Sequence, residues 1–235
     1  MSVVAARARS LPAVAVRDVL LVGLACSSGA VDAIAFLGLG KVFTAFQTGN
    51  LVFLGIGAAG AGGPDVVRVA CSLAAFAAGV FAASLVVRPS KGAGMWPRRV
   101  TLTLAGALTA QAVFLALWVA TSEHPGAGTG DALAAVSALA MGLQSGAVLS
   151  LGVTGVFTTA ATATLMFLMR DAAERTGARA TELERCASVL LGLCGGAAMG
   201  GLLLEHARPY SPLLPMAATA LVIAAASAPS LRAGR

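Results

Sequence analysis

The sequence predicts an all-α, polytopic membrane protein with six spanning helices, two re-entrant or broken helical segments, and two inverted-topology repeats of about 114 residues. The first observation behind this prediction is composition: 58% of the 235 residues are hydrophobic and 11% are charged, with a mean hydropathy of +0.88. A soluble domain has roughly 25% charged residues. This chain therefore has too few charges to cover a surface that faces water.

The second observation is the length of the uncharged runs. Residues 100–120, 186–204 and 211–231 contain no charged side chain. Each run is close to the roughly 20 residues that a helix needs to cross a bilayer. Residues 132–169 are also uncharged, which leaves room for two further segments.

The third observation is an internal duplication. Aligning residues 31–54 with 145–168 gives ten identities, among them Phe43/Phe157, Thr44/Thr158 and Thr48/Thr162. Both copies lie in apolar surroundings, so the chain consists of two related membrane-embedded halves. Such halves are typical of transporters and channels.

Eight apolar segments follow one another along the chain, and the basic residues indicate which of them cross the membrane. The segments are 17–39, 43–60, 66–88, 99–121, 131–153, 156–170, 183–204 and 211–229. If all eight crossed, the basic connector 88–99 would face outward, against the tendency of Lys and Arg to remain in the cytoplasm. If 43–60 and 156–170 instead enter and leave on one side, the basic connectors share the cytoplasmic side. These contain Arg7, Arg9, Arg17, Arg88, Lys91, Arg98, Arg99, Arg170, Arg175, Arg179, Arg185, Arg232 and Arg235.

In this six-span model the opposite face receives Glu123, His124, Asp131, Glu205 and His206. Three crossings per half is an odd number, so the two halves must be inverted relative to one another. The two re-entrant segments then approach the midplane from opposite faces. The predicted organisation is a cytoplasmic N-terminal segment (1–16), a first membrane repeat (17–122), a connector (123–130), a second membrane repeat (131–229) and a cytoplasmic C-terminal tail (230–235).

Composition also argues against several functions. The net charge of +6 arises from basic residues in short connectors, which indicates membrane topology and no nucleic-acid partner. The four cysteines show no CxxC or Cys/His spacing, so we expect no metal site. His124 and His206 are isolated, and no Ser/His/Asp or HExxH pattern occurs. We therefore expect neither an enzyme nor a cofactor.

Asp32 is the ionisable side chain that demands an explanation, because it lies within the first apolar segment. A carboxylate at the centre of a spanning helix costs roughly 2.5–3.5 kcal/mol. One interpretation is coupling to an ion or proton, or contact with the substrate. The other is a structural tie to Thr or Asn side chains of the neighbouring re-entrant segment. Gly146 occupies the matching position of the second half.

The Thr48-Gly49-Asn50 sequence precedes an apolar run and is suited to a helix start. The amide groups at such a start can hold an anionic or polar solute, or the residues can simply cap a buried helix. Gln144 lies near the position equivalent to Asp32. Its side chain either lines the pathway or forms an interhelical hydrogen bond. The side chains that we expect along a substrate or ion pathway are Asp32, Thr44, Thr48, Gly49, Asn50, Gln144, Thr158 and Thr162.

Small residues at four-residue spacing predict close helix contacts. Gly192, Gly196 and Gly200 form one such stripe, and Ala74, Ala78 and Ala82 form another in the related helix. The glycine stripe packs either inside one protomer or between the copies of a homo-oligomer.

The residues 29–36 (GAVDAIAF), the Val-Phe-Thr-Ala-x-x-Thr-Gly-Asn motif at 42–50, and 141–146 (MGLQSG) resemble the uncharacterised YoaK family of bacterial integral membrane proteins. The resemblance extends over nearly the whole chain, with Ala163 standing where a glycine is expected. It implies a six-span protein of the bacterial plasma membrane with no established reaction. The resemblance leaves the function open, and the duplication favours a small secondary transporter or channel for an unknown solute or ion. The alternative is a membrane scaffold or assembly protein without transport activity.

Overall fold

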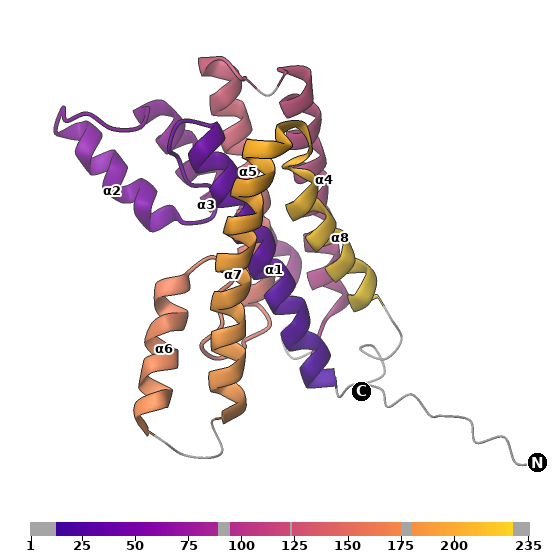
Figure 1. The fold of residues 1–235 in the computed structure, drawn as a ribbon. Helices are drawn as coiled ribbons and strands as arrows, with labels where there is room; N and C mark the ends of the chain where they lie inside the picture. The colour runs from indigo at the N-terminus through magenta and orange to yellow at the C-terminus, as the bar shows by residue number, and fades with distance from the viewer. Residues whose placement is uncertain (1–12, 89–94, 123, 175–179, 228–235) are drawn as a thin grey trace, which may run out of the picture.

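The computed structural model describes residues 13–88, 95–122, 124–174 and 180–227, and within these ranges the chain is all-helical, as predicted (Figure 1). The helices are α1 (Ala13–Gly38), α2 (Gln47–Ala58), α3 (Val66–Val87), α4 (Arg98–Ala120), α5 (Ala127–Leu149), α6 (Ala161–Glu174), α7 (Ala180–His206), the 3-10 turn η3 (Arg208–Tyr210) and α8 (Leu213–Ala226). No strand occurs in the described ranges.

Six of these helical stretches are long and apolar enough to cross a membrane, namely α1, α3, α4, α5, the Glu182–His206 part of α7, and η3 with α8. The other two, α2 and α6, have 12 and 14 residues. At 1.5 Å per residue they extend about 18 and 21 Å, less than the roughly 30 Å of a hydrocarbon core. The six-span prediction is therefore confirmed.

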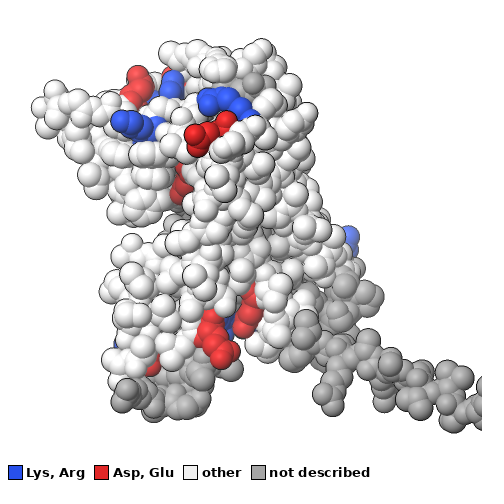
Figure 2. Space-filling view, viewed as in Figure 1, with Lys and Arg blue, Asp and Glu red and all other residues white. Residues whose placement is uncertain are grey.

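The molecular surface agrees with insertion in a bilayer. On the face shown in Figure 2, most charged side chains lie towards the two ends of the molecule, and few lie in the band between them. A band of this kind is suited to lipid tails, because ionised groups are costly at that depth. The protein is thus a multi-pass membrane protein.

The packing of the helices follows the internal duplication. Under the 114-residue shift α1, α2, α3 and α4 correspond to α5, α6, α7 and α8. Helix α1 packs on α7 and α8, and its counterpart α5 packs on α3 and α4. The short helix α2 lies on α3, as α6 lies on α7. The two short helices begin near mid-height and run toward opposite ends of the molecule (Figure 1).

Glycines allow α1 and α7 to approach closely. A Cβ atom on Gly196 would collide with the backbone of Cys26, and one on Gly200 would collide with that of Ala30. Gly192 lies in the same way against Val22. The predicted stripe of Gly192, Gly196 and Gly200 therefore packs inside the protomer. A homo-oligomer formed through it stays an untested prediction.

The second predicted stripe makes no close helix contact within the described part of the protomer. Ala74, Ala78 and Ala82 are exposed on α3. The contact with α5 uses Gly79 and Ala83, which lie one position further along. One residue rotates a helix face by about 100°, so the stripe at 74, 78 and 82 points away from α5.

The ends of the helices can be compared with the predicted topology. Arg17, Arg88, Arg98, Arg99 and Arg185 lie at the end of the molecule where α1 begins and α8 ends (Figure 1). The opposite end has His124, Asp131, Glu205 and His206, together with the basic residues Lys41, Arg68 and Arg208. The predicted positions Arg7, Arg9, Lys91, Glu123, Arg175, Arg179, Arg232 and Arg235 lie outside the described residues. Sidedness therefore stays a prediction.

Candidate functional site

The connection between α1 and α2 is held by Asp32. Its carboxylate accepts hydrogen bonds from the backbone N–H groups of Thr44, Ala45 and Phe46, at 2.8, 2.7 and 2.9 Å. These amides lie just before the first turn of α2, where a negative charge is stabilised by the helix dipole. The structural tie that we predicted for Asp32 exists, but its partners are backbone amides and not Thr or Asn side chains.

Asn50, in the first turn of α2, also hydrogen-bonds the connection between α1 and α2. Its Oδ1 atom accepts from the Phe43 N–H group at 3.1 Å, and its Nδ2 atom donates to the Phe43 carbonyl at 2.6 Å. Gln47 and Ser72 complete the cluster, since Asn50 also donates to both and Ser72 donates to the Phe43 carbonyl. The backbone N–H and carbonyl groups of Phe43, in a segment without helical hydrogen bonds, are thereby paired.

The second half repeats this construction 114 residues later. Thr164, which corresponds to Asn50, accepts from the Phe157 N–H group at 3.1 Å and donates to the Phe157 carbonyl at 3.4 Å. The rings of Phe43 and Phe53 stack at 6.1 Å, and those of Phe157 and Phe167 stack at 6.5 Å. Helix α6 begins at the position that corresponds to the start of α2.

One part of the construction is missing from the second half. Gly146 stands where Asp32 stands, so no carboxylate reaches the amides of Thr158, Thr159 and Ala160. Within the described part of the chain, these three N–H groups donate no hydrogen bond. The Thr158 hydroxyl is also without a partner, although the residue is only 1% exposed.

Two cavities adjoin these connections. The first, which we call the Asp32 cavity, has about 490 Å³ and is bounded by α1, α7 and both connections, including Asp32, Phe46 and Thr159. The second, the Thr158 cavity, has about 310 Å³ and is bounded by α3, α5 and both connections, including Thr48 and Thr158. Each cavity is thus lined by residues from both halves of the chain.

Six of the eight predicted pathway residues lie at the two connections or in the lining of the cavities. Asp32, Thr44 and Asn50 meet in one hydrogen-bonded cluster, and Thr48 and Thr158 line one cavity. Gly49 lies against the rings of Phe43 and Phe46, where a Cβ atom would come within 2.9 Å of both rings.

Two predicted residues stand apart from the cavities. The buried Gln144 donates to the Leu24 carbonyl at 3.0 Å, the interhelical role that we gave as its alternative. Thr162 is exposed on the first turn of α6 and lines neither cavity.

Several residues at the site were not among the predicted pathway set. Ser145 lines the Thr158 cavity, and its hydroxyl lies 2.9 Å from that of Thr159. Thr164 secures the second connection, as described above. The 114-residue shift identifies Thr164 from Asn50, whereas Ser145 has no polar counterpart because Val31 stands at the matching position.

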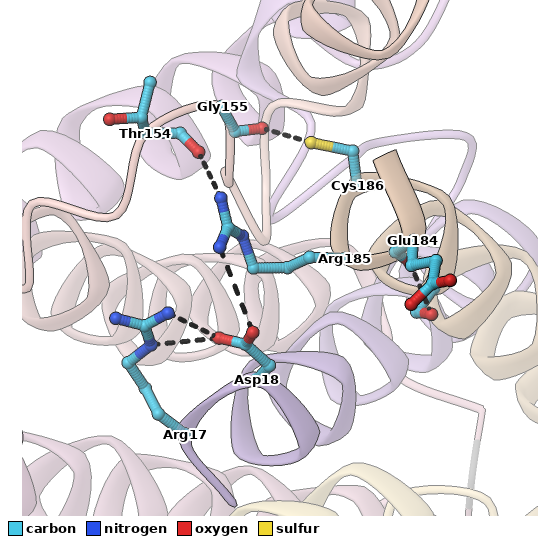
Figure 3. A network of polar contacts seen from close by, with 8 residues as sticks. Arg17, Asp18, Thr154, Gly155, Glu184, Arg185 and Cys186 are labelled. Atoms are coloured by element: carbon cyan, nitrogen blue, oxygen red, sulfur yellow. Dashed lines mark hydrogen bonds and ion pairs between the residues drawn. The ribbon is translucent and has the colours of Figure 1, made fainter. Parts of the chain in front are cut away.

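Ion pairs join the equivalent helices at opposite ends of the molecule. At the end where α3 begins, Arg68 pairs with Asp131 of α5 at 2.8 Å and donates to the Leu39 carbonyl at 2.7 Å. At the other end, Arg185 of α7 lies 3.9 Å from Asp18 of α1 and donates to the Thr154 carbonyl at 3.3 Å (Figure 3). Each arginine therefore ties two long helices to the loop that follows the first helix of one half.

These features define a multi-pass helical membrane protein whose two short helices begin beside shared cavities. The chain belongs to the family described as "Protein of unknown function (DUF1275)", whose model matches residues 20–226. It is 33% identical over 165 residues to the UPF0700 transmembrane protein YoaK of Bacillus subtilis (strain 168), covering 70% of this chain and 71% of that protein. The resemblance predicted from the motifs is thereby confirmed. No solved structure matches the chain.

Proposed function

We propose that this protein is a small secondary transporter or channel whose solute path lies between two inverted repeats. The observation that carries the proposal is the position of α2 and α6, because both begin beside the same two cavities. In membrane proteins, non-helical backbone at this depth is tolerated where it is buried or lines a cavity. Helix starts that meet near the midplane are typical of transporter substrate sites.

The inverted relation of the halves is supported by packing. The α1/α7 and α5/α3 pairs are equivalent under the 114-residue shift, as are the α2/α3 and α6/α7 pairs. The short helices run toward opposite ends (Figure 1). The Arg68–Asp131 and Arg185–Asp18 ion pairs also lie at opposite ends. An in-plane two-fold axis would produce each of these relations.

The chemistry of the lining suits a small polar solute or ion. The walls are mostly apolar, and their polar groups come mainly from the helix starts, such as Thr48, Thr158 and Thr159. The Asp32 carboxylate already accepts hydrogen bonds from three backbone N–H groups. We therefore propose that it positions the connection before α2, in preference to coupling an ion. We place the protein in the bacterial plasma membrane with both termini in the cytoplasm.

The test is flux through purified protein in liposomes. Vesicles loaded with small inorganic and organic ions should release at least one of them faster than protein-free vesicles. Thr48→Trp should reduce this release strongly, because the exposed Thr48 side chain lines the Thr158 cavity and an indole there would fill it.

The matched control is Leu51→Trp, at an exposed position of α2 that lines neither cavity, and it should leave the release unchanged. Absence of release for every ion tested, with folded protein present in the vesicles, would refute transport and favour a scaffold. Equal loss in both variants would place the path elsewhere.

A further inference from the structure

We propose that the N–H groups of Thr158, Thr159 and Ala160 bind a small monovalent carboxylate, in the position that the Asp32 side chain occupies in the first half. This inference names the chemical class of solute for the path proposed above and rests on that path. We call these three amides, with the Thr158 hydroxyl, the open amide cluster.

The first half of the chain shows what such a cluster binds. The matching amides of Thr44, Ala45 and Phe46 all donate to one carboxylate, that of Asp32, at 2.7–2.9 Å. The bend before α6 occupies the same place in the duplication as the bend before α2, because the helix that follows begins at the matching position, Ala161 against Gln47. Three donors at matching positions of the duplication would suit the same kind of acceptor, and the chain supplies no carboxylate at Gly146.

The Thr158 hydroxyl independently indicates a ligand. Its counterpart in the first half, Thr44, receives a hydrogen bond from Ser137 at 3.0 Å. The position that corresponds to Ser137 is Gly23, so Thr158 lacks this partner. A buried hydroxyl without a partner is costly, and Thr158, a residue that is 1% exposed, belongs to the lining of the Thr158 cavity.

The size and charge of the cavity select the ligand. A volume of about 310 Å³ admits a small organic acid, and Ser145 of α5 supplies a hydroxyl to its wall. No lysine or arginine lines the Thr158 cavity within the described residues. Charge compensation therefore comes from the amides and from the start of the 14-residue helix α6, which suits one negative charge and not two.

Binding can be measured without transport. Protein labelled with ¹⁵N-threonine, in detergent micelles, is titrated with sodium acetate, with sodium gluconate as a bulky control at equal ionic strength. The amide resonances of Thr158 and Thr159 should shift with acetate in a saturable manner. The Thr44 resonance should not, because Asp32 already occupies that cluster. No shift at Thr158 and Thr159, or equal shifts at all three residues, would overturn the inference.

A conservative variant tests the hydroxyl. Thr158→Val keeps the shape of the side chain and should weaken acetate binding by about tenfold or more, because a hydrogen bond to a charged group is lost. The matched variant Thr44→Val should leave acetate affinity unchanged. Unchanged affinity in Thr158→Val would contradict the proposed site.

The two proposals can fail separately. Flux of another ion without acetate binding would refute the carboxylate site and leave the path intact. Acetate binding at Thr158 without flux of any ion would refute the path and leave the binding site as an isolated feature.

Discussion

At the scale of single residues, Asp32 and Gly146 explain how one duplicated segment can have two states. Asp32 gives the first connection an acceptor from within the chain, since all three amides before α2 donate to it. Gly146 gives the second connection none. The first half therefore carries its own carboxylate at this cluster, whereas the second half has none, and this difference is the basis of the proposed binding site.

Asp32→Ala should destabilise the protein by at least about 3 kcal/mol, because three buried donors lose their acceptor and each costs about 1–3 kcal/mol. Unfolding by denaturant in detergent measures the loss. Sodium formate should restore part of the stability of the variant and affect the parent protein less. Rescue by formate that is equal in both proteins would contradict this role of the carboxylate.

The two matched threonines should respond in opposite ways when no anion is added. Thr44→Val should reduce the free energy of unfolding by about 1 kcal/mol, because its bond with Ser137 is lost. Thr158→Val should leave it unchanged or raise it, because an unpaired buried hydroxyl is removed. Thermal unfolding of the two variants checks the difference, and a destabilised Thr158→Val would show that its hydroxyl has a partner.

At the scale of elements, the sequence predicted the long helices well and the short ones less accurately. Length and apolar composition are sufficient for the spanning helices, because a bilayer leaves the backbone few alternatives. The predicted segment 43–60 began four residues too early, since α2 starts at Gln47. The bend at 43–46 depends on Asp32 and Asn50, and hydrogen bonds from these side chains to the backbone are not visible in local hydrophobicity.

The candidate site was likewise predicted in part. Asp32, Thr48 and Asn50 were found because polar groups in apolar segments are conspicuous. The open amide cluster was not found, because backbone N–H groups leave no trace in side-chain identity. The sequence does show that Gly146 replaces Asp32 at the equivalent position of the second half. This replacement indicates unpaired amides only once the hydrogen-bond partners of Asp32 are known.

Helix packing between α1 and α7 can be tested with two adjacent glycines. Gly196→Ala should destabilise the protein by about 1–3 kcal/mol or more, because the new methyl group collides with the Cys26 backbone. Gly195→Ala should be neutral or slightly stabilising, since no atom lies within 4 Å of its added Cβ. Resistance to unfolding in detergent distinguishes the two, and similar effects would contradict the close α1/α7 contact.

At the scale of the whole molecule, the halves are joined in a manner that a two-fold axis in the membrane plane would produce. Helix α1 packs on α7 and α8 of the second half, and α5 packs on α3 and α4 of the first half. The short helices α2 and α6 lie on α3 and α7 and run toward opposite ends of the molecule (Figure 1). A path between such halves would be reached from each face past one short helix. This arrangement is what makes alternating access or a pore conceivable for a chain of 235 residues.

The most direct test is the side of the membrane from which the far ends of α2 and α6 are reached. Single cysteines are placed at the equivalent exposed positions Ala59 and Ala173, in a background where Cys26, Cys71, Cys186 and Cys194 are replaced. A membrane-impermeant maleimide is applied to intact and to opened bacterial cells. We expect Ala59→Cys to react in intact cells and Ala173→Cys only after opening. Reaction of both residues from the same side would contradict the inverted arrangement on which the proposed path depends.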